Sequence, residues 1–447
     1  MKYIILCDLG RLPGGVIMSD FNIKDFYNNK RYQDAIDYAS NGNVRESFSE
    51  WDYLYLTNCY YNLKNYSDYL KIYKEFIAKY PASKILDNKM GWCLYHLYIK
   101  NFNFGKMDKT SYFKRVDYIL SRCDDTQFSP KTWVAKVVID SIFKCKVAAG
   151  IDYTLGNKYL SFINPLTLED DEQVISDRDG KERHLASPRE QWYNRKTKAL
   201  VELKQYDECL TYIDQAFRNV KVFHNNADHW LNYKRALCYY AQEKLDKAEE
   251  TINSILSKFQ HWCYYELLFD ICVKKKDTSN ALKYGAFCAT ADKVHKTRVK
   301  FYVKYAAFLD EIGNSYEAAL HLKLTELIRV EEGWKQLQLP SNYQYPEDII
   351  HMDKNTVIRL LNNFWRKEKE KGVEFYEGTV DKLLLNGKSG FVKDNNGNSY
   401  YFNIRDFDKR DFGSIEEGIK VRFTLTERLD KKKNEMKLNA ISISIVR

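Results

Sequence analysis

The sequence predicts a mainly α-helical chain of stacked helix pairs that ends in a small all-β barrel. Three observations support this fold class. The 447 residues include only 7 Pro and 19 Gly, a scarcity that favours long helices with short connections. Apolar residues recur at helical spacing through most of the chain, and after Gly372 the period changes to two. Hydrophobic residues at 45% and charged residues at 29% exclude a disordered polymer.

The first 22 residues are expected to form a tail before the helices. Their apolar run, from Tyr3 to Cys7, is too short for the h-region of a signal peptide, and no stretch of 18 apolar residues follows. The ten Cys include no C-x-x-C pair, and most lie in apolar helical stretches, which is typical of a reducing cytoplasm. We therefore expect a cytoplasmic protein with no membrane partner.

Residues 23–335 show a repeated pattern of paired helices. The first copy runs from Tyr53 to Pro81, and later copies contain Tyr193, Ala236, Phe269 and Ala306. Their offsets resemble the tetratricopeptide (TPR) unit, in which two antiparallel helices interlock large and small residues. The resemblance implies an α-solenoid with irregular units, whose curvature leaves a concave face for a protein partner. Helical pairs without a peptide groove are the alternative.

Residues 169–187 interrupt this pattern with acidic and polar residues. Asp177, Asp179 and Gly180 are spaced as in a calcium loop, but the twelve-residue EF-hand register would start at Ile175 and end at Ala186, and neither is a ligand. We therefore expect a polar insertion loop that divides the helical array in two.

A connector with a basic helix follows the array. The helix is expected to start with Asn355 or Thr356 as its cap, and to end at Gly372 after the charged run Arg366–Lys371.

The last segment alternates like a β domain. Val421-x-Phe423-x-Leu425 and Ile441-x-Ile443-x-Ile445 are half-buried strands by pattern. About 70 residues with five such strands fit the OB-fold, a small Greek-key barrel.

Three motifs in this segment resemble the cold-shock domain. They are Gly378-Thr-Val380, Lys388-Ser-Gly-Phe-Val392 and Tyr400-Tyr-Phe-Asn403. The resemblance implies binding of single-stranded RNA or DNA, with bases stacked on aromatic rings of two neighbouring strands.

The chain departs from the cold-shock pattern at three positions. Ser389 replaces one stacking Phe, Lys382 stands at the Trp position of the first strand, and Asn403 replaces the His. The related S1 domain is the alternative, since residues 428–438 resemble its last hairpin. Both alternatives are OB barrels with the same binding face.

The domain organisation follows from these patterns. We predict an N-terminal tail (1–22), an N-terminal TPR-like array (23–168), a polar insertion loop (169–187), a C-terminal TPR-like array (188–335), a connector with a basic helix (336–371) and a cold-shock-like OB domain (372–447).

Alternation places Phe391 and Tyr401 on the outer face of the barrel and points Val392, Tyr400 and Phe402 inward. Phe407 or Phe412 are candidates for a further ring. The predicted nucleic-acid site consists of Lys382, Lys388, Phe391, Lys393, Tyr401, Asn403 and Arg405.

Charge supports a nucleic-acid partner independently of the motifs. Residues 354–371 carry a net charge of +4 and residues 372–447 a net +2, out of +9 for the whole chain. A basic helix that leads into a barrel can follow a phosphate backbone. The alternative is that Arg366–Lys371 is a solvated helix end, favoured there by the helix dipole.

No active site is predicted. The phosphate-loop, zinc-protease helix and nucleophile-elbow motifs do not occur. His224 and His229 form the only close His pair, and no Cys or Glu nearby in sequence completes a metal set, so we expect capping or surface roles. Trp51, Trp92 and Trp133 lie in helical apolar stretches and are attributed, like most other Trp, to core packing. We predict no catalytic residue, metal or cofactor.

Together these patterns predict a non-catalytic adaptor. The TPR-like array would bind an unidentified protein, and the OB domain would bind single-stranded nucleic acid, with RNA favoured over DNA. The domain order is similar to that of TPR–OB proteins found beside helicase, primase and nuclease components in prokaryotic mobile-element conflict systems. The alternative is a pure protein scaffold whose barrel docks a partner.

Overall fold

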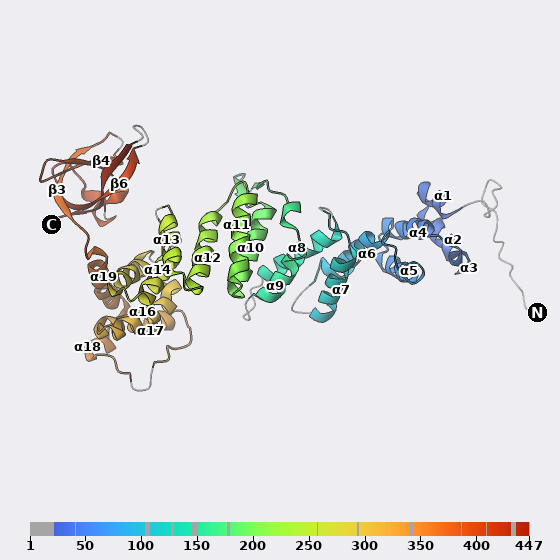
Figure 1. Ribbon diagram of the computed structural model, residues 1–447, viewed down its shortest axis with the longest axis horizontal. Coiled ribbons are helices and arrows are strands. Elements are labelled where there is room, and N and C mark those ends of the chain that lie inside the picture. The colour runs from blue at the N-terminus through green and yellow to red at the C-terminus, as the bar shows by residue number, and fades with distance from the viewer. Residues whose placement is uncertain are drawn as a thin grey trace, which may run out of the picture. The chain divides into compact units, whose positions relative to one another are not determined.

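The computed structural model describes residues 22–446 except positions 41, 103–107, 127–128, 145–150, 177–178, 257, 293–294, 340–342, 386, 408 and 431–434. The predicted tail before residue 22 lies outside the described residues. The chain divides into two compact units, Met1–Ile255 and Leu256–Arg447, and the predicted fold class is confirmed (Figure 1).

The first unit is built from short helices and one small hairpin. Its elements are α1 (Ile23–Asn28), α2 (Tyr32–Ala39), α3 (Gly42–Glu46), α4 (Glu50–Asn62), α5 (Tyr66–Lys79), α6 (Asp87–Leu94) with a π-helical turn (Tyr95–Ile99), α7 (Lys109–Arg122), α8 (Pro130–Phe143), α9 (Tyr153–Leu160), β1 (Gln173–Ser176), β2 (Glu182–Leu185), α10 (Pro188–Glu202), α11 (Tyr206–Asn219), α12 (Ala227–Ala241) and α13 (Leu245–Leu256).

The second unit holds helices followed by the barrel. Its elements are α14 (Trp262–Lys274), α15 (Thr278–Thr290), α16 (Val299–Glu311), α17 (Ser315–Glu331), α18 (Glu347–Ile350), α19 (Lys354–Glu370), β3 (Tyr376–Leu383), β4 (Ser389–Asp394), β5 (Ser399–Asn403), β6 (Lys420–Asp430) and β7 (Glu435–Ile445), with 3₁₀ turns at Ile404–Asp406 and Lys409–Ser414 after β5. None of the described helices is both long and apolar enough to cross a bilayer.

One turn geometry joins the two helices of every predicted repeat. Between α4 and α5, Lys64 has φ = 57° and the amide of Asn65 donates to the carbonyl of Tyr60 at 2.9 Å, which is the bond of a Schellman motif. The same positive φ recurs after α10, α12, α14 and α16, at Lys204, Glu243, Lys276 and Gly313. The helix pairs therefore share their geometry although only one of these turns carries Gly.

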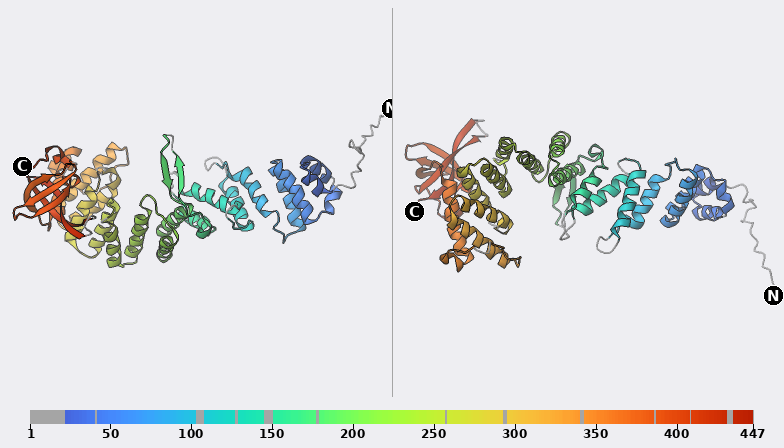
Figure 2. Two further views of the ribbon diagram at one scale, coloured as in Figure 1. Left: turned by 90° about the horizontal axis from the view of Figure 1, so that it is seen from above. Right: turned by 60° about the horizontal axis from the view of Figure 1, so that its bottom comes forward.

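The insertion differs from its prediction. The segment 169–187 contains a hairpin in which β1 and β2 pair antiparallel, from Gln173 opposite Leu185 to Ser176 opposite Glu182; Figure 2 shows it as a green ribbon that stands away from the helices. It does not divide the array. The helices α9 and α10 on either side of it pack together, and the boundary between units lies near Ile255 instead.

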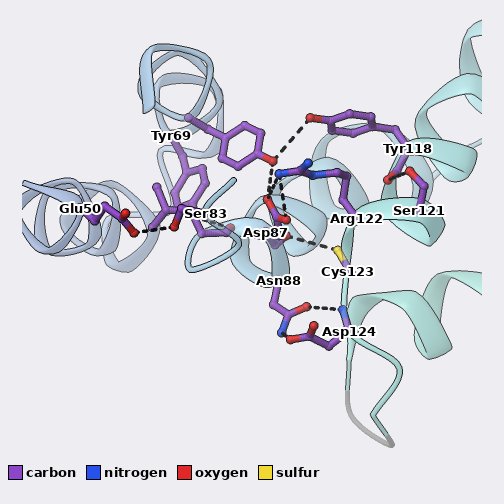
Figure 3. A network of polar contacts seen from close by, with 12 residues as sticks. Glu50, Tyr69, Ser83, Asp87, Asn88, Tyr118, Ser121, Arg122, Cys123 and Asp124 are labelled. Atoms are coloured by element: carbon purple, nitrogen blue, oxygen red, sulfur yellow. Dashed lines mark hydrogen bonds and ion pairs between the residues drawn. The ribbon is translucent and has the colours of Figure 1, made fainter. Parts of the chain in front are cut away.

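A buried polar network locks α5, α6 and α7 together in the first unit (Figure 3). Asp87, at the start of α6, is only 2% exposed. Its carboxylate accepts a 2.5 Å hydrogen bond from the Tyr73 hydroxyl of α5 and forms a 3.1 Å ion pair with Arg122 of α7. The thiol of Cys123 donates to the Asp87 carbonyl at 3.3 Å. Three successive helices thus share one carboxylate.

The predicted basic helix corresponds to α19, which packs into the second unit. Its cap is Asp353 rather than Asn355 or Thr356, because the Asp353 carboxylate accepts the amide N–H groups of both residues. Val357, Leu361 and Trp365 form its buried face, which lies against α15 and α17.

The five C-terminal strands form a closed barrel in the order β3-β4-β5-β7-β6. All pairs are antiparallel except β5 with β7, a Greek-key arrangement. The core includes Val392, Phe402, Val421 and Phe423, as alternation predicted. Gly390 is required by this packing, because a Cβ there would lie 2.4 Å from the Lys382 carbonyl oxygen and 2.7 Å from the Phe402 ring.

Candidate nucleic-acid interface

Three of the predicted site residues form one row across the barrel. Lys382 of β3 lies opposite Phe391 of β4, which lies opposite Tyr401 of β5. Directly opposite residues share a face of the sheet. The Phe391 and Tyr401 rings meet edge to face, with centroids 5.8 Å apart, and both are half-exposed. The row therefore presents two rings beside an exposed ammonium group, and Asn439 of β7 extends it next to Tyr401.

A second row, one step along the strands, is polar and basic. Lys393 of β4 pairs with Thr379 of β3, which in turn pairs with Lys420 of β6; on the other side, Lys393 pairs with Ser399. Both Lys393 and Lys420 are exposed. Lys420 was not in the predicted site, because its place beside Thr379 depends on the β3–β6 register that closes the barrel.

The turn between β4 and β5 holds the two rows in register. The Asp394 carboxylate accepts the amides of Asn396 and Asn398 at 2.9 and 2.8 Å, and the hydroxyl of Tyr400 donates to it at 3.2 Å. The hydrogen bond from the Asn398 side chain is the main cause that lowers the pKa of Asp394. This ionised turn fixes β4 against β5 and so fixes Phe391 against Tyr401.

The other three predicted residues lie at the strand ends. Lys388 precedes β4 and Arg405 follows β5, and both are exposed. They are close in space, since the Ile404 amide donates to the Lys388 carbonyl at 2.9 Å. Asn403 serves a structural role, because its side-chain oxygen caps the following 3₁₀ turn by accepting the Arg405 amide at 3.1 Å.

The two candidate extra rings have different positions. Phe407 is buried in the core, with its ring centroid 5.1 Å from that of Phe402, so it cannot stack on a base. Phe412 is exposed in the 3₁₀ turn Lys409–Ser414. Ser389, which replaces a stacking Phe of the cold-shock pattern, is buried. The face therefore has two aromatic rings.

The end of the β6–β7 hairpin carries exposed apolar side chains. Met436 is 59% exposed and Leu438 is 48% exposed, and both lie on one face of β7 by alternation. On the other face, Arg428 makes a two-pronged contact with Asp406 at 3.0 and 3.1 Å.

A second candidate surface lies in the first unit and corrects the assignment of Trp to the core. Trp133 of α8 is 49% exposed, and its ring lies 6.3 Å from that of Trp92. His96, in the π-helical turn after α6, stacks on Tyr66 of α5 at 4.9 Å with nearly parallel planes. π-Helical turns are frequent at functional sites. The rings around Trp92 and Trp133 are therefore available to a partner. Trp51 of α4 is 61% exposed as well, so it too departs from the predicted core position.

His224 takes part in a cluster that sequence spacing did not reveal. Its two ring nitrogens contact Glu190 of α10 at 2.8 Å and Glu172 at 2.9 Å, and Glu172 also contacts His184 of β2 at 2.8 Å. The contact with Glu172 is the main cause that raises the pKa of His224. The cluster fastens the β1–β2 hairpin to the helices, and Glu172 was missed because it lies 52 positions from His224.

Within the part of the chain that the structure describes, no three His, Cys, Asp or Glu side chains are placed to share a metal ion.

Comparison with known proteins assigns no family. No protein-family model matches the chain, and no curated protein matches it. Similar solved structures include a human IFIT1 dimer with PPP-AAAA, 13% identical over 79% of this chain and 74% of that chain, with a TM-score of 0.32.

Two further similar solved structures are part of a TPR repeat-containing protein and the apo form of RapI. The C-terminal part of a TPR repeat-containing protein from Cytophaga hutchinsonii is 14% identical over 63% of this chain and 91% of its own, with a TM-score of 0.23. The apo form of RapI is 11% identical over 76% of this chain and 82% of its own, with a TM-score of 0.25. At such scores, none of the three carries an assignment of function.

Proposed function

We propose that the chain is a non-catalytic adaptor whose barrel binds single-stranded nucleic acid, RNA in preference to DNA, while its helical units hold a protein partner. The row Lys382–Phe391–Tyr401 carries the first part of this proposal, because it places two half-exposed rings beside a cation. The non-catalytic part rests on the sequence, in which the searched enzyme motifs do not occur.

The chemistry of the two rows matches a single strand. Bases can stack on Phe391 and Tyr401, since every base has a flat aromatic face. Lys382, Lys393 and Lys420 can then contact phosphates on either side of the rings. A face with two rings predicts micromolar rather than nanomolar affinity, because each stacked base contributes only about 1–3 kcal/mol.

The test is fluorescence anisotropy of labelled single strands of about 12 nucleotides, a length within the usual range for OB domains, with the full-length chain. We expect RNA and DNA to bind more weakly as salt rises. Replacing both rings, Phe391→Ala with Tyr401→Ala, is expected to weaken binding by at least about 30-fold, which corresponds to two stacks at the low end of their range.

The matched control is Trp334→Ala, which removes an exposed ring after α17, outside the barrel, and is expected to leave the affinity unchanged. Circular dichroism of each variant checks that the barrel is intact. Equal affinity of the double variant and the wild type would reject this face as the binding site.

For the protein partner, we propose the aromatic surface around Trp92 and Trp133 of the first unit. Half-exposed aromatic residues are enriched among the residues that dominate binding energy at interfaces. A partner captured by the full-length chain is expected to be lost from Trp133→Ala and retained by Trp51→Ala. The reverse result would place the partner elsewhere. The wider setting that we propose is a prokaryotic mobile-element or defence-associated system, on the basis of domain order.

The alternative function is a pure protein scaffold, and the exposed end of the β6–β7 hairpin favours it. Met436 and Leu438 form an apolar pair that a docking protein can cover. This alternative predicts no salt-sensitive binding to either strand, and loss of a barrel partner on Met436→Ser with Leu438→Ser.

A further inference from the structure

A basic groove in the second unit lies between α19 and the β6–β7 side of the barrel. It has a volume of about 1040 Å³ and is lined by the C-terminal half of α19, the end of α15 and residues of β6 and β7; α19 and β6 are labelled in Figure 1. A volume of this order is typical of ligand sites. None of the predicted site residues lines it.

The packing of α19 explains why the groove is basic. Val357, Leu361 and Trp365 turn inward against α15 and α17. The residues that line the groove, such as Asn362, Arg366 and Lys369, are spaced by four and three positions and therefore share one face, which lies beside the buried face. The charged run at the end of this helix thus faces the barrel wall as well as solvent.

Lys369 is the most informative residue of the groove. Its ammonium group is half-buried, donates to the neutral Thr290 hydroxyl at 3.2 Å and lies 5.9 Å from the centroid of the Phe287 ring. Burial lowers its pKa. Among the described residues, no carboxylate lies within ion-pair distance of it. Glu370 attracts this ammonium group from beyond ion-pair distance. A partly desolvated charge with no direct ion-pair partner is unfavourable, so an anion in the groove would stabilise it.

The other cations leave the groove with a positive surplus. Arg366 and Lys367 are exposed, and neither forms an ion pair within the described residues. Arg422 of β6 lies over the Phe375 ring at 3.5 Å and reaches Glu370 only at 3.9 Å. The remaining acid at the groove, Asp406, already accepts both hydrogen bonds of Arg428.

The groove continues onto the ring-bearing face through β6. Lys420 and Arg422 are two positions apart on this strand, so both point outward. Lys420 ends the row that contains Thr379 and Lys393, while Arg422 lines the groove. A chain of cations therefore runs from the rows on β3–β4–β5 to α19.

We propose that the groove binds the sugar–phosphate backbone of the same single strand, beyond the nucleotides that stack on Phe391 and Tyr401. Arg422, Arg366 and Lys367 contact its phosphates, and Lys369 supplies a half-buried charge that a phosphate neutralises. This inference rests on the proposed function, and it makes the basic helix part of the binding site instead of a solvated helix end.

Strand length tests the inference in the full-length chain. Strands of about 4 and about 12 nucleotides, within the site sizes of OB domains, are compared by anisotropy. Arg366→Gln with Lys367→Gln is expected to lower the affinity for the 12-nucleotide strand about 10-fold and to leave the affinity for the 4-nucleotide strand unchanged. For the longer strand, the slope of log affinity against log salt concentration should become shallower by about 0.7 for each cation removed. The matched control is Lys258→Gln with Lys300→Gln, two exposed lysines outside the groove.

Lys369→Met separates binding from folding. Methionine keeps the packing on Phe287 and removes the unpaired charge, so we expect the melting temperature to hold or rise while the long strand binds several-fold more weakly. A merely structural Lys369 would instead lower the melting temperature and leave binding unchanged.

The outcomes distinguish this inference from the proposed function. If the Arg366/Lys367 variant and its control bind the long strand with equal affinity, binding in the groove is rejected, and binding at Phe391 and Tyr401 is unaffected by that result. If the groove variant weakens binding while the Phe391/Tyr401 variant does not, the ring face fails and the strand binds in the groove alone.

Discussion

The two compact units hold their helices together with different kinds of buried polar contact. In the first unit, the Asp87 carboxylate joins Tyr73 and Arg122 through a charged network. In the second, the indole N–H of Trp365 on α19 donates to Nε2 of His321 on α17 at 2.9 Å. Since Nε2 accepts, Nδ1 carries the proton of a neutral imidazole, and it contacts the Glu317 carbonyl at 2.7 Å.

The difference shows that similar helix contacts can respond to pH in different ways. An ion pair stabilises a contact between helices only while both partners are charged, and neutralising one partner leaves the charge of the other unpaired. A buried imidazole such as that of His321 stabilises a contact between helices only while it is uncharged. Burial accordingly lowers the pKa of His321 to about 4, and it raises the pKa of Tyr73 above its ordinary value.

The largest loss of stability is expected from Asp87→Ala. It leaves the Tyr73 hydroxyl and the Arg122 guanidinium without their acceptor, and we expect the free energy of unfolding of the first unit to fall by about 4 kcal/mol. The measurement is urea unfolding followed by hydrogen exchange of peptides from α5, α6 and α7.

The control for this prediction is Asp124→Ala, which removes the exposed acid bound by Asn88 and should change stability by less than about 0.5 kcal/mol. Equal losses in the two variants would show that the buried network does not hold these helices.

The second-largest effect is a loss of stability of the second unit at acidic pH. His321 has its ordinary pKa of 6.5 when unfolded and a pKa of about 4 when folded. Its neutral form is therefore favoured by folding, so its contribution is complete above pH 6.5 and is lost as the pH falls from 6.5 to 4. A shift of this size corresponds to a loss on the order of 3 kcal/mol. Hydrogen exchange of α17 and α19 across this range measures it.

His321→Gln sharpens the same comparison, because glutamine does not titrate. Whatever its stability at neutral pH, the variant should take up about one proton fewer on unfolding below pH 6.5, and its stability should depend less on pH. His295, whose pKa burial also lowers, keeps part of the dependence. An unchanged slope would assign the acid response to other groups.

The smallest effect concerns a turn geometry that both units share. Lys204 in the first unit and Lys276 in the second adopt positive φ, which costs a non-glycine residue about 1 kcal/mol. We expect Lys204→Gly to raise the free energy of unfolding by about 0.5 kcal/mol, because glycine also loses more chain entropy on folding. The gain should recur in Lys276→Gly. A loss of stability in both variants would contradict it.

The fold was largely predictable because it depends on periodicity. Each predicted repeat corresponds to a helix pair, and Val392, Phe402, Val421 and Phe423 are buried as alternation required. The repeated turn was not visible, because its defining residue is Lys or Glu in four of the five cases and only glycine signals positive φ in a sequence.

The candidate site was predictable in part. Lys382, Phe391 and Tyr401 were identified from motif spacing, and the register brings them into one row. Lys420 was not predicted, because only the pairing of β3 with β6, which closes the barrel, places it beside Thr379. Asn403 resembled a base-contacting residue in sequence, but its side chain forms a capping box with Asp406, three positions on.

The sequence by itself determined the helix pairs, the barrel strands, the two outward rings and the basic helix, since each follows from residues within a few positions of one another. Only the tertiary structure decided that β6 extends the cationic rows, that α19 faces the barrel across a groove, and that Trp365 contacts His321, 44 positions away. The physical reason is that periodicity specifies which face of an element is buried, whereas register and packing between distant elements specify which neighbour covers it.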